Sequence, residues 1–205
     1  MTLFPFFVDI EGREGLIIGG GRHALDKVNR LLPYGPRLRL IAPEFKIELE
    51  QNPALELIHR DFRDEDLDTC PAFVIVAGED IQENHRISAL CRERKIPVNV
   101  VDDREYCDFI FPSLIAHGNL SIGICTGGAS PATGVLLKRR IEAQIPDNIE
   151  EILDFLYEKR PVIMESIPDK KRRYAFYYQL SEYCMEKNRA LTEEEFDKLL
   201  VREKV

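Results

Sequence analysis

The segment Gly15-Leu-Ile-Ile-Gly-Gly-Gly-Arg-His-Ala-Leu-Asp-Lys27 sets a glycine cluster between an apolar run and an amphipathic stretch. Written as G-x-G-x-x-A, the cluster uses Gly19, Gly21 and Ala24. The run 16–18 predicts a short buried strand, and apolar residues then recur at helical spacing: Ala24, Leu25, Val28, Leu31 and Leu32. A strand that turns through glycines into a helix N-terminus offers backbone N–H groups and a favourable dipole to a phosphate. The motif therefore indicates a dinucleotide cofactor and redox chemistry, provided that its context is right.

That context is an alternation of strands and helices. Apolar runs predict four further strands, at 37–43, 55–59, 72–78 and 97–102. A helix is expected from 80 to about 95, with Asp80 as its cap and these residues on its buried side: Ile81, Ile87 and Leu90. Alternation of this kind is typical of a parallel sheet with right-handed crossovers. We therefore predict an α/β fold with a Rossmann-type parallel sheet and the glycine cluster at its first strand-to-helix turn.

The pattern changes near residue 112. The stretch 113–125 predicts two strands joined by a turn at His117-Gly-Asn119. The loop Thr126-Gly-Gly-Ala-Ser-Pro131 then leads into a helix, with Ser130 as its N-cap and the proline as its first residue. Further helices are expected at 148–159, at 169–187 and after the capping box Thr192-Glu-Glu-Glu195. The predicted division is a Rossmann domain at 1–112, a small α+β segment at 113–146 and a helical region at 147–205.

Bulk composition limits the class of protein. The chain has 205 residues, of which 44% are hydrophobic and 31% are charged, as is ordinary for a soluble globular protein. Its apolar stretches are too short to span a bilayer, and no basic n-region precedes a long apolar core near Met1. We therefore expect no membrane span and a cytoplasmic location. The net charge of −8 argues against general nucleic-acid binding.

Cysteine and histidine spacing predicts neither a disulfide framework nor a metal site. The five cysteines are odd in number and include no C-x-x-C pair. We expect them to be free thiols packed as small hydrophobic residues: Cys70, Cys91, Cys107, Cys125 and Cys184. His59 and His85 show no ligand spacing, and His117 in a turn is expected to be exposed.

Several segments, taken in order, resemble one family. They are Phe4-Pro-Phe-Phe-Val-Asp-Ile-Glu-Gly-Arg13, which resembles that family's opening strand and turn, the glycine cluster 19–21, Pro97-Val-Asn-Val-Val-Asp-Asp103 followed by Cys107-Asp-Phe-Ile-Phe-Pro112, and the loop 126–131. Residues 3 to 146 resemble the precorrin-2 dehydrogenases, which also form the amino-terminal module of sirohaem synthases. The rest of the chain is similar only as a helical tail.

The resemblance implies a function. The family oxidises precorrin-2 to sirohydrochlorin with NAD⁺ on the way to sirohaem or cobalamin, and it forms homodimers around the segment that corresponds to 113–146. The small-molecule substrate is then the tetrapyrrole precorrin-2. Some members also insert ferrous iron, so a bifunctional dehydrogenase and ferrochelatase is one alternative. A non-catalytic module that senses NAD or a tetrapyrrole is another.

Asp102 is the candidate catalytic residue. It ends a predicted buried strand, at the edge where open α/β sheets bind ligands, and a carboxylate there can act as a base during oxidation. The resemblance implies the same role, because the family's proposed acid/base is the aspartate of this Asn-Val-Val-Asp run. The alternative is a loop cap. Asp103 is interpreted as a turn residue.

The resemblance also implies a cofactor site. The corresponding positions are Gly19, Gly20, Gly21, Arg22, His23, Pro43, Glu44 and Gly78. The sequence departs from the family at Arg22 and His23, and at Asp26, where the family has a basic residue. The second predicted strand ends without a ribose-binding acid, as in the family, and without an arginine, which favours NAD over NADP.

A second loop is the candidate substrate site. A loop before a helix can hold a substrate carboxylate through its N–H groups, and precorrin-2 carries many carboxylates. The residues assigned to it are Thr126, Gly127, Gly128 and Ser130. Basic residues at 138–140 either supply partners for these carboxylates or form a solvated helix face. The basic run at 170–173 and the aromatic residues that follow it either cover the macrocycle as a lid or form a packed helix with a basic end.

Overall fold

The computed structural model describes residues 3–204, which form two compact units. One unit is Phe6–Phe111, and the other begins at Pro112 and includes the residues that precede Phe6. The three-part division at 112 and 146 stays a prediction.

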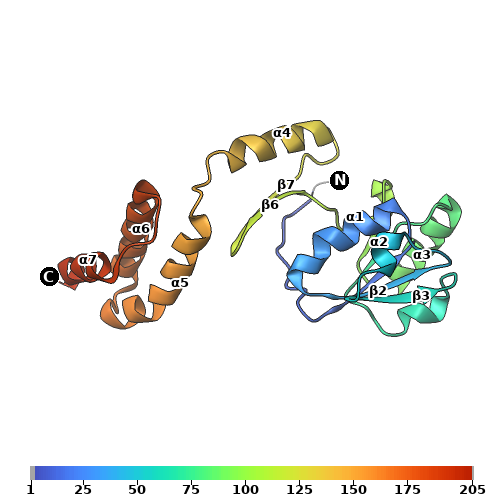
Figure 1. The fold of residues 1–205 in the computed structure, drawn as a ribbon, viewed down its shortest axis with the longest axis horizontal. Helices are drawn as coiled ribbons and strands as arrows, with labels where there is room; N and C mark the ends of the chain where they lie inside the picture. The colour runs from blue at the N-terminus through green and yellow to red at the C-terminus, as the bar shows by residue number, and fades with distance from the viewer. Residues whose placement is uncertain (1–2, 205) are drawn as a thin grey trace. The chain divides into compact units, whose positions relative to one another are not determined.

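The Phe6–Phe111 unit is built on one parallel sheet of five strands, ordered β3-β2-β1-β4-β5. Figure 1 labels β2 and β3 of this sheet. The strands are β1 (Glu14–Ile18), β2 (Arg37–Ala42), β3 (Leu55–His59), β4 (Phe73–Val76) and β5 (Val98–Val100). Its helices are α1 (Arg22–Leu31), α2 (Ile47–Glu50) and α3 (Ile81–Glu93), with short 3₁₀ turns η1 (Leu32–Tyr34), η2 (Asp64–Leu67) and η3 (Arg104–Tyr106). The predicted Rossmann-type sheet is confirmed.

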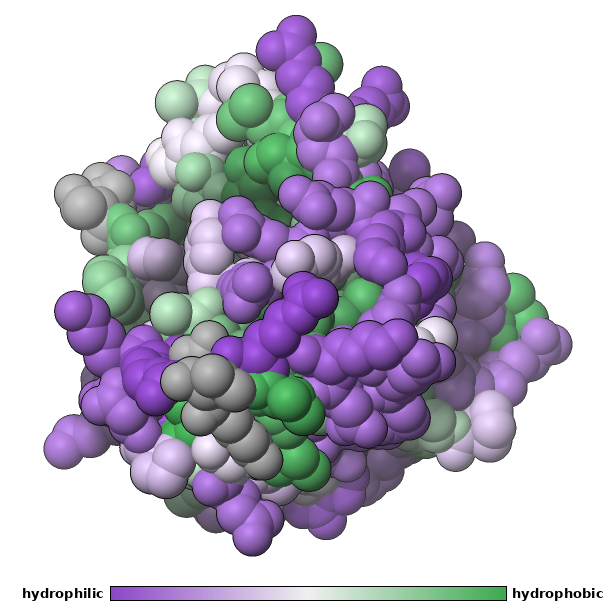
Figure 2. Space-filling view, turned by 90° about the vertical axis from the view of Figure 1, so that its left-hand side faces the viewer, coloured by the Kyte–Doolittle hydropathy of each residue, from purple (hydrophilic) through white to green (hydrophobic). Residues whose placement is uncertain are grey.

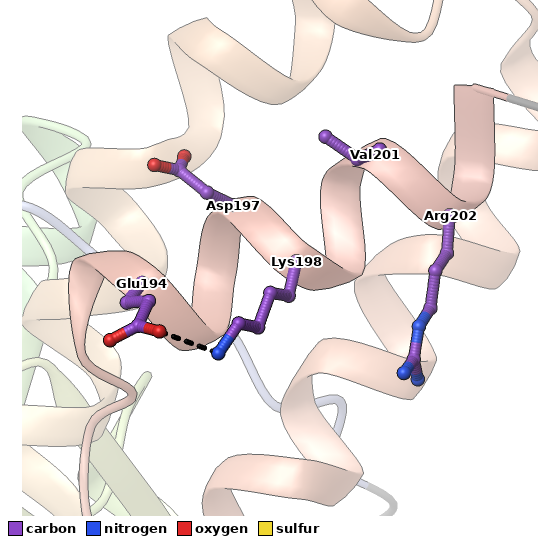
Figure 3. Close-up of a pocket in the computed structure, with 5 residues that line it drawn as sticks. All are labelled: Glu194, Asp197, Lys198, Val201 and Arg202. Carbon is purple, nitrogen blue, oxygen red and sulfur yellow. Dashed lines mark hydrogen bonds and ion pairs between the residues drawn. The ribbon is translucent and has the colours of Figure 1, made fainter.

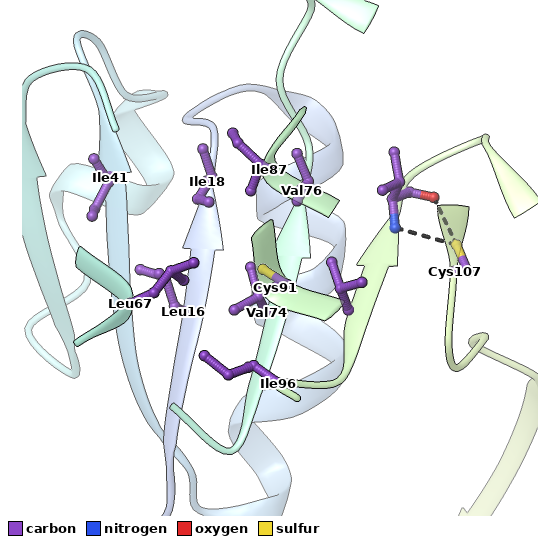
Figure 4. Packing of buried hydrophobic residues seen from close by; sticks show 12 residues of the cluster. Leu16, Ile18, Ile41, Leu67, Val74, Val76, Ile87, Cys91, Ile96 and Cys107 are labelled. Atoms are coloured by element: carbon purple, nitrogen blue, oxygen red, sulfur yellow. Dashed lines mark hydrogen bonds between the residues drawn. The ribbon is translucent and has the colours of Figure 1, made fainter. Parts of the chain in front are cut away.

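Alternate residues of β1 face opposite sides of the sheet, as the strand period of two requires. Leu16 and Ile18 belong to the cluster that packs under α3, which is shown in Figure 4. Ile17 belongs to the cluster under α1, together with Val28. Both faces of β1 and β4 are therefore covered, and this explains why the two strands are apolar throughout.

Two predictions about α3 have different outcomes. Asp80 caps the helix as expected, because its Oδ1 accepts from the N–H groups of Gln82 and Glu83 at 2.9 and 3.2 Å. The prediction that Ile81 belongs to the core is wrong, since 65% of its surface is exposed. The buried stripe of the helix is made of Asn84, Ile87, Ser88 and Cys91, and Ile81 lies in the first turn, ahead of that stripe.

The opening stretch and two of the cysteines also differ from expectation. Residues 3–10 form no strand, because they take part in no sheet ladder, and Phe6 and Phe7 are exposed. All five cysteines are free, but only Cys91, Cys107 and Cys184 are buried. Cys70 and Cys125 are exposed, since both lie in loops outside the packed elements.

The second unit begins with an antiparallel pair, β6 (Ser113–His117) and β7 (Leu120–Ile124), and continues through four helices. These are α4 (Pro131–Glu142), α5 (Ile149–Ser166), α6 (Lys170–Lys187) and α7 (Glu193–Lys204). The expected hairpin turn lies at 118–119, and Thr192 and Glu195 exchange the two bonds of a capping box, at 2.9 and 3.3 Å.

An aromatic core holds the last three helices together. Phe155 of α5 and Phe176 of α6 both pack edge-on against Phe196 of α7, with ring centroids 6.0 and 6.5 Å apart. Seen from the end where α6 and α7 lie, the surface is mostly hydrophilic, with smaller apolar areas between the charged side chains (Figure 2). Among residues 3–204, every helix is too short or too polar to span a lipid bilayer.

Candidate functional site

Three of the predicted site regions lie at one edge of the parallel sheet. Ile18, Val76 and Val100 are in register across β1, β4 and β5, so the segments that follow them leave the sheet at the same edge. The chain crosses from β1 to β2 on one side and reaches β4 on the other, which makes this edge the topological switch point. Open α/β sheets bind their ligands in this position. The structure therefore brings the glycine cluster, the turn at Gly78 and Asp102 to a single edge.

The first two glycines of the cluster are required by the packing of the loop itself. Gly19 has φ of +124°, and a Cβ atom there would lie 2.6 Å from the carbonyl oxygen of Ala77. A Cβ atom on Gly20 would lie 2.0 Å from the carbonyl oxygen of Glu44. The Gly20 carbonyl also accepts a hydrogen bond from Lys46 N at 2.9 Å. These two residues fix the path of the loop between β1 and α1.

Gly21 differs from its two neighbours. It is the N-cap of α1 with an ordinary φ of −86°, and a Cβ atom placed on it would meet no atom within 4 Å. No side chain caps α1, and no acidic residue occupies its first turn. The first turn of α1 therefore has no capping side chain, and the space beside Gly21 is open. An uncapped helix start of this kind suits the pyrophosphate of a dinucleotide.

The residues that depart from the family pattern are all on the surface of the loop and helix. Arg22, His23 and Asp26 are exposed, and Asp26 forms a 3.3 Å ion pair with Lys27. Their side chains add charge around the helix start.

Pro43 and Glu44 follow β2 and are exposed. The backbone of Glu44 lies next to the glycine loop, because its carbonyl faces Gly20. Behind it, the ring of Phe45 packs edge-on against His59 at 5.0 Å.

Gly78 is exposed, and the packing around it also requires a glycine. A Cβ atom there would lie 2.8 Å from Asn84 Oδ1, and Asn84 Nδ2 donates to the Gly78 carbonyl at 2.9 Å. Asn84 is buried on α3, so this bond ties the end of β4 to the helix. Sequence reasoning missed Asn84.

Asp102 lies two residues beyond β5, not within the strand, and its φ is +60°. This left-handed conformation is uncommon for a residue with a side chain, although aspartate tolerates it better than most. Asp102 is exposed, and within residues 3–204 its carboxylate has no hydrogen bond or ion pair. A base at this edge must be free to accept a proton, and Asp102 meets that condition.

Asp103 is held by a partner. Its Oδ2 lies 2.6 Å from His85 Nε2, and the imidazole ring stacks on Tyr106 with centroids 3.6 Å apart. The two adjacent aspartates thus have different surroundings. Sequence reasoning set His85 aside because its spacing matches no metal site, and the pairing with Asp103 joins residues 18 positions apart.

Cys107 contacts the backbone of the same loop through its buried thiol. Its Sγ lies 3.1 Å from the carbonyl oxygen of Val100 and 3.2 Å from that of Asp103, and it accepts from Val100 N at 3.2 Å. Burial raises the pKa of the thiol, so Cys107 remains protonated and donates to these carbonyls.

The loop 126–130 belongs to the second unit. Gly127 and Gly128 have φ of +62° and +82°, which glycine adopts without strain. Thr126 Oγ1 donates to the Ser130 carbonyl at 3.0 Å, and Ser130 Oγ accepts from Thr133 N at 3.2 Å. The expected N-cap is confirmed, while a substrate role for these residues stays a prediction.

Replacing Ser130 with alanine is expected to cost about 0.5–2 kcal/mol of stability, because the first turn of α4 loses its cap. Unfolding by denaturant measures the loss, and hydrogen exchange locates it in residues 131–142. Ser130→Asn, which retains a capping oxygen, should remain close to the parent protein. Unchanged stability and unchanged hydrogen exchange of α4 in the alanine variant would contradict the role of the cap.

Two hollows of the surface are lined by other residues. One, of about 580 Å³, is lined by a single helix, and Figure 3 shows its residues along α7: Glu194, Asp197, Lys198, Val201 and Arg202. Glu194 and Lys198 form an ion pair across it at 2.6 Å. A second, of about 390 Å³, lies between 8–11 and 33–35. Neither contains a predicted site residue. Among the described side chains, no three of His, Cys, Asp or Glu gather as metal ligands would.

Comparison with known proteins places these observations in a family. Residues 6–113 match the family described as "Putative NAD(P)-binding". The chain is 37% identical over 185 residues to a siroheme synthase of Thioalkalivibrio sulfidiphilus, covering 89% of this chain and 38% of that protein. It is 34% identical over 183 residues to the siroheme synthase of Pseudomonas paraeruginosa, covering 88% and 39%. The chain thus spans about two fifths of the length of these relatives.

One solved structure covers the whole fold. "SirC, precorrin-2 dehydrogenase" superposes with a TM-score of 0.70 at 23% identity, covering 98% of this chain and 99% of that one. At this identity the match shows a shared fold. The family match extends over more than half of the 205 residues and contains the whole parallel sheet, the glycine loop and Asp102. This chain belongs to the putative NAD(P)-binding family.

Proposed function

We propose that this protein oxidises precorrin-2 to sirohydrochlorin with NAD⁺ as the hydride acceptor. The observation that carries the proposal is the free carboxylate of Asp102 at the same sheet edge as the open helix start at Gly21. The similarity to siroheme synthases supports it, and so does the fold shared with a precorrin-2 dehydrogenase.

The glycine loop is the proposed seat of the cofactor. The N–H groups at the start of α1, in Arg22 and His23, would bind the pyrophosphate above Gly21. NAD⁺ supplies the hydride acceptor when it is bound. Pro43 and Glu44 would lie on the adenosine side, and the Glu44 carboxylate would repel the additional phosphate of NADP. Gly78 would allow the remainder of the cofactor to approach the end of β4.

Asp102 is the proposed acid/base. Oxidation removes a hydride and a proton from the reduced macrocycle and leaves one additional double bond in the product. The exposed Asp102 carboxylate takes the proton, and its position beyond β5 leaves it accessible to a bound substrate. Asp103 is unsuited to this role, because its carboxylate is already paired with His85.

Thr126, Gly127, Gly128 and Ser130 are proposed to bind carboxylates of the substrate. The positive end of the α4 dipole favours an anion at this loop. A homodimer is a second part of the proposal, supported by exposed apolar residues on α4: Val135, Leu136 and Leu137. Iron insertion and a cytoplasmic location stay predictions.

A turnover assay tests the function. Precorrin-2 and NAD⁺ are incubated with the folded protein, and sirohydrochlorin absorbance and NADH formation are followed together. We expect both to rise in equal amounts, and turnover with NADP⁺ to be much slower. Binding of NAD without any NADH formation would reject the dehydrogenase and favour the sensing module. Parallel reactions with ferrous or cobaltous ions, compared with the uncatalysed rate, test iron insertion.

A further inference from the structure

The loop that carries Asp102 is fixed by one face of α3. We call residues 101–108 the Asp102 loop. His85, Ser88 and Arg92 succeed one another along this face of the helix, and each contacts the loop. His85 Nε2 lies 2.6 Å from Asp103 Oδ2. Ser88 Oγ donates to the Tyr106 carbonyl at 2.8 Å. These two side chains of one helix thus form hydrogen bonds with successive parts of the loop.

Arg92 completes the set. Its Nη2 donates to the Glu105 carbonyl at 3.1 Å, and its Nε donates to Asp108 Oδ1 at 3.0 Å. On the strand side, the buried Cys107 thiol bonds the carbonyls of Val100 and Asp103. The loop is therefore anchored at both ends and along one side.

Asp102 needs such an anchor. A residue with a side chain in a left-handed conformation persists where its surroundings hold it there. The Asp102 carboxylate adds no contact of its own, because within residues 3–204 it is bonded to no other group. Beyond the tolerance of aspartate for this region, the conformation depends on the neighbouring residues, and the adjacent Asp103 side chain is bonded to His85.

His85 makes two contacts at once. Its ring edge bonds Asp103, directly after Asp102, while its face stacks on Tyr106 with an interplanar angle of 5°. The side chains of His85 and Asp103 are only about one third exposed, at 31% and 33%. A single imidazole thus fixes two points of the loop, and its short bond and parallel stacking restrict its own orientation.

We propose that His85 is a positioning residue that acts through Asp103 and Tyr106 to hold Asp102 in its left-handed conformation. This inference rests on the proposed function, in which Asp102 accepts the proton. His85 itself forms no bond with Asp102 and is assigned no proton transfer. Its contribution is geometric, since a base displaced by about 1 Å can lose up to about 10²-fold in rate.

The first test is kinetic. His85→Ala should lower kcat for precorrin-2 oxidation roughly ten- to a hundredfold, with KM for NAD⁺ unchanged, because the glycine loop is not affected. His85→Gln, which keeps a hydrogen-bond donor for Asp103, should recover part of the loss. Arg86→Ala is the matched control. It removes ion pairs with Glu83 and Asp64 at 2.8 Å from the same helix, away from the loop, and should retain the parent kcat.

A double-mutant cycle separates positioning from general loosening. If His85 acts through Asp103, the losses of kcat in His85→Ala and Asp103→Ala should not add in the double variant. Additive losses would overturn the inference, as would equal kinetics in His85→Ala and Arg86→Ala.

Hydrogen exchange supplies a readout that does not need turnover. Amides of the Asp102 loop should exchange faster in His85→Ala than in the parent protein or in Arg86→Ala. Unchanged exchange would overturn the inference even in an active enzyme. A parent protein that binds NAD⁺ but does not oxidise precorrin-2 would reject the proposed function, and the exchange measurement would still decide whether His85 holds the loop.

Discussion

Replacing Asp102 with asparagine is expected to lower kcat for precorrin-2 oxidation by about 10²-fold or more, the range for loss of a general acid–base group. Asparagine has the same shape, and it tolerates the φ of +60° found at this position. The backbone of the loop should therefore stay in place while the proton acceptor is lost. NAD⁺ binding, measured by calorimetry, should be unchanged, because the helix start at Gly21 is not altered.

Asp80→Asn is the matched control for this substitution. Asp80 follows β4 and caps α3, so it is also an acidic residue near the carboxyl edge of the sheet. Asparagine caps a helix about as well as aspartate, and the variant should fold and turn over as the parent does. Near-normal turnover by Asp102→Asn would remove Asp102 from the chemistry. An equal loss in both variants would indicate a general effect of the negative charge at this edge.

The fold could be predicted because its signals are local. The Leu16–Ile18 run, the glycines and the spacing of Ala24 and Val28 all fall within one strand and one helix, where periodicity reports directly on burial. The caps at Asp80 and Ser130 are likewise decided within a few residues. The prediction that Ile81 is buried is wrong because spacing gives the face of a helix but not the residue at which the packed stripe begins.

The site could be predicted only in part, for a physical reason. The sequence places Asp102 after a buried strand, but it carries no signal for a positive φ at an aspartate. That conformation depends on contacts between α3 and the Asp102 loop, such as the His85–Asp103 pair. Contacts of this kind join residues that are distant in sequence, so they leave no periodic pattern. The supporting residues appear only when the helix is packed against the sheet.

Gly21→Ala is expected to weaken NAD⁺ binding by roughly 10- to 100-fold while the protein stays folded. A methyl group at Gly21 meets no protein atom within 4 Å, and φ of −86° suits alanine, so the free protein accommodates it. The same methyl group occupies the space in which the pyrophosphate would approach the helix start. Overpacking of this kind costs about 1–3 kcal/mol, which corresponds to the stated range in Kd. Calorimetric titration with NAD⁺ measures the change.

Gly20→Ala, in contrast, should destabilise the free protein. Its Cβ would lie 2.0 Å from the Glu44 carbonyl, so the loop between β1 and α1 must move and the free energy of unfolding should fall. Thermal unfolding of the two variants without cofactor therefore separates glycines needed for the fold from the glycine needed for the ligand. If Gly21→Ala binds NAD⁺ like the parent protein, the pyrophosphate does not pass over Gly21. The cofactor would then have to lie elsewhere along the sheet edge, and the proposal that it lies beside Asp102 would lose its structural basis.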